Sequence, residues 1–325
     1  MNALPSPVRA ALSAVVVAAV LVLLPYRAEA FSPGKCLRPP PLVDPIIYWN
    51  KCPEDPGGPF NVDAGGRDVL VRLPRNRVCR KRLSVIYARN LRINGGKFVY
   101  DDVERQVISI GHTGGATFID GVHIDVNAKY ADAIRFYRHT GTVVVQNTLV
   151  EGVSGIESGV HGDILHAQGD GPLANLTLQN VTGYTGYQGL FVPYRTATRH
   201  GTRRLKLDRV NLGYDPEVIV IHPLMLLFMG NVDDPLDLPP DLGTELINVF
   251  LDGSVRNFPF ERAAYAYPVK DDNGCAWFDA KHGIKGPVCS GKPPSGDYAP
   301  SSRVGLNYSR AAFCSSTATV AAGTK

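Results

Sequence analysis

Short apolar segments with alternating polar positions follow one another along the chain from about residue 67 to residue 255. Most contain an apolar–x–apolar step, then Asn, Asp or Gln, and then further apolar residues, with almost no helical period. This alternation predicts strands, and the Gly, Asn and Asp residues between the segments predict turns. The clearest segments are residues 91–96, 118–124, 143–149, 176–181, 205–210 and 249–255. We therefore expect an all-β structure over this range.

The polar residue inside each segment gives the period of the pattern. These residues are Asn94, Asp120, Gln146, Gln179, Asp208 and Asp252, at intervals of 26, 26, 33, 29 and 44 residues. A drifting period above about 20 residues is typical of solenoids, in which each repeat buries its apolar face against its neighbours. The longer intervals predict loops inserted on one face, which is often the binding face.

A second strand is expected within each repeat. Its segments are residues 107–110, 133–136, 163–166, 189–192 and 218–221, and the first four follow one another at intervals of 26, 30 and 26 residues. Two sets of strands that advance in step predict a parallel β-helix solenoid, in which every second side chain points inward. The alternative is an ordinary all-β sandwich with short strands.

The two ends of the chain differ from the repeats. Arg9 is followed by an apolar run and by Ala28-Glu29-Ala30, which predicts a secretory signal cleaved after Ala30, with an uncleaved membrane anchor as the alternative. Proline and glycine then exclude long regular elements up to residue 66. The expected units are a signal peptide (1–30), an irregular N-terminal segment (31–66), the β-helix (67–255) and a C-terminal cap and tail (256–325). The protein is expected to be exported, either periplasmic or secreted.

All six cysteines lie in the part that follows the signal, three early and three late: Cys36, Cys52, Cys79, Cys275, Cys289 and Cys314. An even number in an exported protein predicts up to three disulfides. Connectivity does not follow from the sequence, and the local pairs Cys36–Cys52 and Cys275–Cys289 are the expectation. The long middle of the chain, which has no cysteine, is expected to be held by packing alone.

The repeats over about residues 80–255 resemble the right-handed parallel β-helix superfamily, the pectin-lyase-like fold. Residues 161–164 (His-Gly-Asp-Ile) and 186–191 resemble a pair of segments found in exported β-helix proteins. The resemblance implies binding of, or action on, acidic polysaccharides, although a fold alone does not determine a function. The paired aspartates of polygalacturonase-like hydrolases are not visible in this sequence, and a lyase is favoured over a hydrolase. The calcium-binding acids typical of pectate lyases are not visible either.

Residues 161–170 gather two histidines, two aspartates and a glutamine within ten residues. A lyase must neutralise the uronate carboxylate and remove the C5 proton with a base. Arg135 or Arg195 suits the first role, and His161 or Tyr194 suits the second, with Asp163 orienting the histidine. The predicted catalytic residues are His161, Asp163 and Arg135, and the predicted substrate-binding residues are Gln168, Gln188, Tyr194, Arg195 and His166. The alternative is a polar turn that satisfies its own backbone.

Strict alternation predicts which of these side chains face outward. With Asp163 outward, Ile164 points inward, and Leu165 and Arg135 point outward in matching register. His166 would then point toward the core, where a lone histidine is usually structural.

The net charge of the chain is +4, and many of its basic side chains lie in two clusters. They comprise Arg67, Arg72, Arg75, Arg77, Arg80, Lys81 and Arg82, and Arg195, Arg199, His200, Arg203, Arg204, Lys206 and Arg209. A positive groove would attract anionic sugar chains, although a solvated edge explains the first cluster equally well. Nucleic acid is not expected as a partner, because the protein is exported and few aromatic residues are interleaved. No cofactor is firmly indicated; an acidic loop near Asp233 leaves Ca²⁺ open, without the spacing of a calcium loop.

Two hypotheses follow. The first is an exported enzyme, a polysaccharide lyase that acts by β-elimination at a uronate. The second is a non-catalytic β-helix protein that binds glycan or builds a surface structure.

Overall fold

The computed structural model describes most of the chain between residues 36 and 314. The described residues are 36–102, 105–155, 161–167, 173–193, 202, 204–215, 217–218, 225–229, 243–253, 264–265, 269–270, 274–277 and 284–314. The predicted signal peptide, the predicted site residues Gln168, Tyr194 and Arg195, and the acidic loop near Asp233 lie outside these ranges. Across the described ranges, no helix has the length and apolarity needed to cross a membrane.

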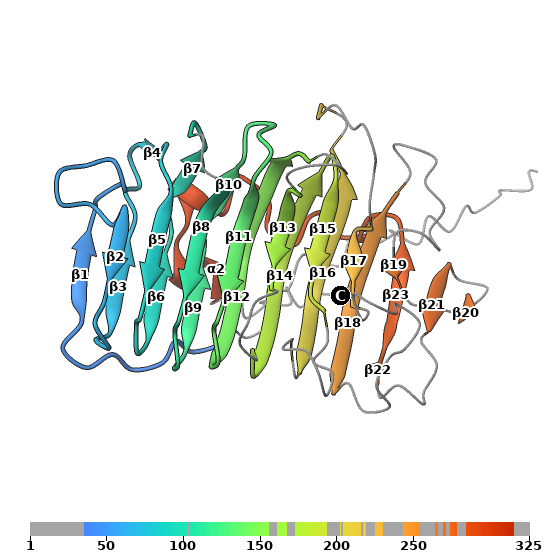
Figure 1. The fold of residues 1–325 in the computed structure, drawn as a ribbon. Coiled ribbons are helices and arrows are strands. Elements are labelled where there is room, and N and C mark those ends of the chain that lie inside the picture. Colours follow the sequence, from blue (N-terminus) through green and yellow to red (C-terminus); the bar gives the residue numbers. More distant parts are fainter. Residues whose placement is uncertain are drawn as a thin grey trace, which may run out of the picture.

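The described residues form an all-β structure built on two large parallel sheets (Figure 1). In spatial order, the main path of the first sheet is β1 (Ile46–Trp49), β3 (Val69–Arg72), β6 (Leu91–Asn94), β9 (Thr117–Asp120), β12 (Thr142–Val153), β14 (Asn175–Thr185), β16 (Leu205–Tyr214), β18 (Thr244–Asp252) and β23 (Pro287–Ser290). The second is β2 (Asn61–Asp63), β5 (Leu83–Ile86), β8 (Gln106–Gly111), β11 (Asp132–Tyr137), β13 (Asp163–His166), β15 (Gln188–Phe191), β17 (Leu227–Phe228) and β19 (Ala264–Tyr265).

Shorter strands complete the first sheet. β4 (Val78–Cys79), β7 (Lys97–Val99) and β10 (His123–Asp125) pair beside its main path, β22 (Ile284–Lys285) pairs with β18, and β21 (Cys275–Trp277) and β20 (Val269–Lys270) continue antiparallel beyond β23. Because the chain visits the two sheets in turn and each strand pairs in parallel with its counterpart in the next repeat, the arrangement is consistent with a β-helix-like solenoid.

One apolar column shows why these segments stack. It runs in register through seven strands of the first sheet, and all of its members are buried: Val71, Ile93, Ile119, Val145, Leu178, Leu207 and Leu246. Burying an aliphatic side chain contributes about 1.5–3 kcal/mol, and a register slip of one residue would turn the whole column outward. The alternation read from the sequence therefore fixes the pairing of this sheet.

The polar column next to it confirms most of the predicted period. Asn94, Asp120, Gln146, Gln179 and Asp208 pair with one another in this order. The expectation for the last member was wrong, because Ile247 pairs with Asp208 and Asp252 pairs with Gly213. Asp252 lies in the second half of the long strand β18, beyond the corner described next.

A column of left-handed residues follows the polar column. Its members and their φ angles are Gly95 (61°), Gly121 (75°), Asn147 (52°), Asn180 (51°), Arg209 (57°) and Asn248 (53°). Glycine and asparagine adopt this conformation more readily than other residues. Asn180 is fully buried, donates from Nδ2 to Asn147 Oδ1 at 2.8 Å and accepts from Arg209 Nε at 2.6 Å. This corner is therefore held by side-chain hydrogen bonds between repeats.

Asn180→Ala is expected to lower the free energy of unfolding by about 2 kcal/mol more than Asn248→Ala, as measured by chemical denaturation. Both substitutions place alanine in the left-handed region, which costs about 1–2 kcal/mol. Asn248 is exposed, so its variant reports the backbone conformation alone, whereas Asn180→Ala also leaves buried polar groups without partners. Equal losses in the two variants would show that the hydrogen bonds between repeats contribute nothing.

The second sheet differs from the sequence expectation in its register. Ile108, Ile134, Leu165, Leu190 and Leu227 form its central column. The expected match of Arg135 with Leu165 was wrong, since Arg135 pairs with His166.

The physical reason for this shift is that the side chains do not alternate between buried and exposed at the start of the strand. Ile164 and Leu165 are consecutive and both are buried, as are the equivalent residues of β11, Ala133 and Ile134. The strand expected at residues 218–221 lies largely outside the described ranges, and Leu227–Phe228 continues the column instead.

Residues 291–314 run back along the first sheet, toward the N-terminal part of the molecule. Tyr298 N donates to Asn211 Oδ1 at 3.2 Å, and Gly305 N donates to Gly121 O at 2.9 Å. The segment includes the 3-10 turn η3 (Gly305–Asn307) and the short helix α2 (Arg310–Cys314). Figure 1 shows α2, in red, back among the cyan and green strands. The end of the described chain thus lies against strands formed some 190 residues earlier.

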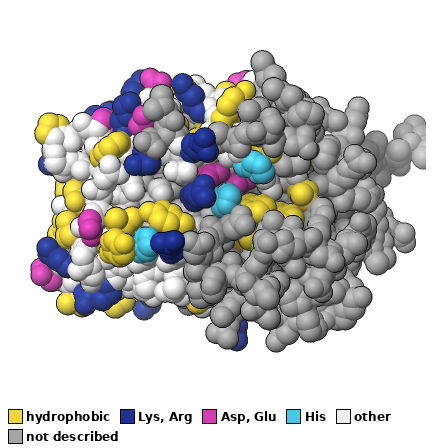
Figure 2. All heavy atoms as spheres, in the orientation of Figure 1, with side chains coloured by type: hydrophobic (Ala, Val, Ile, Leu, Met, Phe, Trp, Pro, Cys, Tyr) yellow, Lys and Arg dark blue, Asp and Glu magenta, His cyan; other side chains and the backbone are white. Residues whose placement is uncertain are grey.

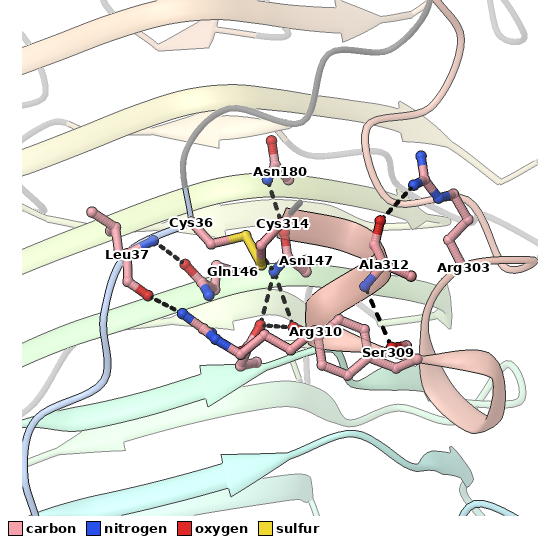
Figure 3. The surroundings of a disulfide bond; sticks show 12 residues. Cys36, Leu37, Gln146, Asn147, Asn180, Arg303, Ser309, Arg310, Ala312 and Cys314 are labelled. Carbon is pink, nitrogen blue, oxygen red and sulfur yellow. Dashed lines mark hydrogen bonds and ion pairs between the residues drawn. A yellow bond between two sulfur atoms is a disulfide. The ribbon is translucent and has the colours of Figure 1, made fainter. Parts of the chain in front are cut away.

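Three disulfides form: Cys36–Cys314 (Figure 3), Cys52–Cys79 and Cys275–Cys289. The predicted Cys275–Cys289 pair is confirmed, and the predicted Cys36–Cys52 pair is wrong. Cys36 meets Cys314 because the returning C-terminal segment and the segment that precedes β1 both lie beside β12, a tertiary contact that local spacing does not encode. This bond lies against β12, where Asn147 Nδ2 is 3.6 Å from Cys36 Sγ.

Candidate functional site

Four charged side chains from β11 and β13 meet on the second sheet: Asp132, Arg135, Asp163 and His166, here called the His–Asp cluster. His166 Nδ1 lies 2.6 Å from Asp163 Oδ2 and 3.8 Å from Asp132 Oδ2. Arg135 Nη1 lies 3.4 Å from Asp132 Oδ2, and the backbone N–H of Asp163 donates to Asp132 Oδ1 at 3.1 Å. Figure 2 shows basic, acidic and histidine side chains gathered near the middle of this face.

The same sequence spacing builds both halves of the cluster. Each strand begins with an aspartate, and a cationic side chain follows three residues later. The step without alternation at the start of each strand lets the first and fourth side chains meet, which a regular strand would not allow. Since Arg135 pairs with His166, the two cationic side chains lie next to each other on adjacent strands.

Burial decreases from the acids to the cations. The side chains of Asp163 and Asp132 are 1% and 2% exposed, that of His166 is 12% exposed, and that of Arg135 is 36% exposed. The two carboxylates of the cluster are therefore buried away from water, and its imidazole and guanidinium reach the surface.

These surroundings shift the pKa of both members of the Asp163–His166 pair upward. Burial raises the pKa of Asp163, the charge of Asp132 adds to this, and the hydrogen bond from His166 opposes it. Burial would lower the pKa of His166, but hydrogen bonds to Asp132 and Asp163 and their charges outweigh it and raise this pKa to about 9. His166 is therefore protonated at neutral pH and becomes a free base in the alkaline range.

Gln188 of β15 lies on the strand next to Asp163. It pairs with Asp163 in register and is buried. Among the described residues, neither Gln188 Oε1 nor Asp163 Oδ1 has a hydrogen-bond partner. Two acceptor atoms thus lie on neighbouring strands beneath the cluster, where a proton or a cation would be stabilised.

The register column that contains Arg135 and His166 continues into two aromatic residues. Phe191 pairs with His166, and Phe228 pairs with Phe191. The His166 and Phe191 rings lie 4.9 Å apart, and the two phenylalanine rings stack at 4.8 Å. Phe191 is partly exposed, whereas Phe228 is buried. Arg135, His166 and the Phe191 ring thus offer charge beside one apolar face, which suits a charged sugar.

Of the predicted site residues, Asp163, Arg135 and His166 meet in the cluster, and Gln188 lies beside Asp163 on the next strand. Predicted to point toward the core, His166 is instead partly exposed beside Arg135. His161 is exposed and meets the Tyr187 ring edge-on, with centroids 5.6 Å apart. Sequence reasoning missed Asp132, although the repeated Asp-x-x-cation spacing in residues 132–135 and 163–166 was a readable signal.

The cluster also offers a metal-ligand set. One ligand atom from each of Asp132, Asp163 and His166 lies within 4.8 Å of the other two. Two carboxylates and an imidazole suit a divalent transition metal, whereas Ca²⁺ prefers six to eight oxygen ligands. Binding through Nδ1 would have to displace the hydrogen bond between His166 and Asp163.

Neither a family model, nor a curated protein, nor a solved structure matches this chain. Function is therefore inferred from the geometry of the cluster and from the fold.

Proposed function

We propose that this chain is an exported right-handed parallel β-helix protein of the pectin-lyase-like class, and that it cleaves an acidic polysaccharide by β-elimination at a uronate. The observation that carries the proposal is the Arg135–His166 pair on adjacent strands, with His166 held from behind by buried Asp163. The two sheets, the three disulfides and the lack of a membrane-spanning helix among the described residues are compatible with this class and with export.

The proposed chemistry needs a cation and a base close together. In a uronate, the carboxylate is attached to C5, the carbon whose proton is removed. Neighbouring strands lie about 4.8 Å apart, so a guanidinium on one and an imidazole on the next can reach these two groups of one sugar. Arg135 neutralises the carboxylate, which makes the C5 proton more acidic.

His166 acts as the base in this scheme. Asp163 accepts the Nδ1 proton, which leaves Nε2 as the basic atom. Nε2 takes the C5 proton, the double bond forms between C4 and C5, and the bond from C4 to the glycosidic oxygen breaks. The imidazolium then gives the proton to the departing oxygen, so that His166 returns to its starting state. Asp132 positions Arg135.

The test is ultraviolet absorbance during incubation with a panel of polyuronates, because elimination creates a double bond conjugated to the carboxylate. We expect absorbance to rise with at least one polyuronate and with none of the neutral polysaccharides used as controls. Parallel assays with a chelator and with added Mn²⁺, Zn²⁺ or Ca²⁺ would show whether a metal takes part. Unchanged absorbance across the whole panel, metals included, would contradict the lyase proposal.

The second candidate is a non-catalytic β-helix protein that binds glycan. This candidate is favoured because the charged groups of the cluster already pair with one another. Both aspartates are almost fully buried, and His166 and Arg135 each contact a carboxylate. Binding to polyuronates without any absorbance change would support this candidate.

A further inference from the structure

A separate pocket lies on the first sheet, where four strands end. Trp49, Arg72, Asn94 and Asp120 are the last residues of β1, β3, β6 and β9, and they pair in this order. Together with Arg310 from the returning C-terminal segment and other neighbours, they line a cavity of about 450 Å³. This volume fits one or two sugar rings.

The charge of this pocket is strongly positive. Arg72, Arg75, Arg92 and Arg310 line it, and Asp120 is the one acidic residue in its lining. Asp120 is already bound by Arg310 and accepts from the Tyr308 hydroxyl at 2.6 Å. Within the described residues, no carboxylate lies within ion-pair distance of the other three arginines.

Among these cations, Arg92 gives the strongest indication that the pocket binds an anion. It donates from Nη2 to the Pro40 carbonyl, while its Nε is buried without a hydrogen-bond partner among the described residues. Burial lowers the pKa of Arg92, and the charges of Arg310 and Arg72 lower it further. A partly buried guanidinium that neighbouring cations repel is stabilised by an anion.

Trp49 adds an aromatic surface to the rim. It is 58% exposed, and the guanidinium carbon of Arg72 lies 4.1 Å from the centroid of its ring. Arginine beside tryptophan offers a fork for an oxyanion and a flat face for a ring. Figure 3 shows Arg310 reaching toward Leu37 near the Cys36–Cys314 bond, which ties the segment that carries Arg310 to the start of the described chain.

We propose that this arginine pocket binds an anionic saccharide, with a carboxylate or sulfate held between Arg72, Arg75 and Arg92 and the sugar ring against Trp49. The pocket goes beyond the proposed function, because it lies on the other sheet and needs no reaction at the His–Asp cluster. The arginine pocket would hold the polysaccharide, or one end of it, at a second binding site away from the His–Asp cluster.

Binding is tested by isothermal titration calorimetry with four probes: digalacturonate, a sulfated disaccharide, inorganic phosphate and the neutral disaccharide cellobiose. We expect at least one charged disaccharide to bind, more tightly than phosphate and with an affinity that falls as salt rises, and no binding of cellobiose. Arg75→Gln and Arg72→Gln should each weaken binding about tenfold, by removing a charge-assisted hydrogen bond. Arg80→Gln, an exposed arginine outside the pocket lining, is the matched control and should bind as the unmodified protein does.

Two results would overturn the inference: unchanged affinity in both Arg75→Gln and Arg72→Gln, or phosphate binding as tightly as the disaccharides. The His166→Gln variant separates this inference from the lyase proposal. If the pocket binds the probe, His166→Gln keeps the affinity, whatever happens to catalysis. Loss of binding in His166→Gln alone would place the probe at the His–Asp cluster and would also overturn the inference.

Discussion

Replacing His166 with glutamine is expected to lower the rate of β-elimination about 10²-fold or more while leaving the fold intact. General bases typically contribute 10²–10⁴-fold to a rate, and glutamine can still donate a hydrogen bond to Asp163 but cannot accept the C5 proton. Initial rates of absorbance change on the preferred polyuronate measure the loss, and circular dichroism checks the fold. His112→Gln, at the residue that directly follows β8 of the same sheet and outside the cluster, is the matched control and should keep full activity.

The pH profile supplies the readout that a structural role would not change. Because the pKa of His166 is raised to about 9, the neutral base is the minor form at pH 7. The rate should therefore rise about tenfold per pH unit from neutral pH and level off above about pH 9. Asp163→Asn removes a carboxylate that holds the proton on His166, so the same rise should shift to lower pH.

Several outcomes would contradict this assignment. One is a rate independent of pH between 6 and 10, and another is full activity in His166→Gln. An inactive His161→Gln beside an active His166→Gln would favour the histidine that the sequence favoured first. The pair of variants thus decides between the exposed histidine beside Tyr187 and the one held by Asp163.

The second large effect concerns the bond between the two ends of the described chain. Replacing both Cys36 and Cys314 with serine is expected to lower the free energy of unfolding by about 5 kcal/mol, because the bond closes a loop with a sequence separation of 278 residues. Replacing both Cys275 and Cys289, which are separated by 14 residues, should cost about 3 kcal/mol. Denaturant unfolding without reductant compares the two double variants. A smaller loss for the longer loop would contradict the chain-entropy reasoning.

Much of the first sheet could be predicted from the sequence because its signal is local. The apolar-x-apolar step before Asn94, Gln146 and Gln179 indicates which face is buried, and the spacing of these residues and Asp120 indicates which strands pair. The register of the second sheet was harder to predict from the sequence. Consecutive apolar residues such as Ile164 and Leu165 are both buried, so strict alternation misplaced His166 by one position.

The residues that were missed are brought to their sites by contacts between distant parts of the chain. Asp132 joins the cluster from the preceding repeat, 31 residues before Asp163. Arg310 reaches Asp120 from the far end of the chain. Arg72 and Arg75 were singled out as part of a basic cluster, but the return of the C-terminal segment decides that a pocket forms beside them rather than an open edge.

The Cys36–Cys314 bond has a consequence for how the molecule withstands cleavage. It closes almost the whole described chain into a covalent ring. A single cut in the backbone between these cysteines opens the ring but does not divide the molecule, because the fragments stay joined through sulfur and through the strands that pair across the cut. A protease that reaches one exposed loop would therefore leave a nicked protein of unchanged mass, apart from the added water, for as long as the bond stays oxidised.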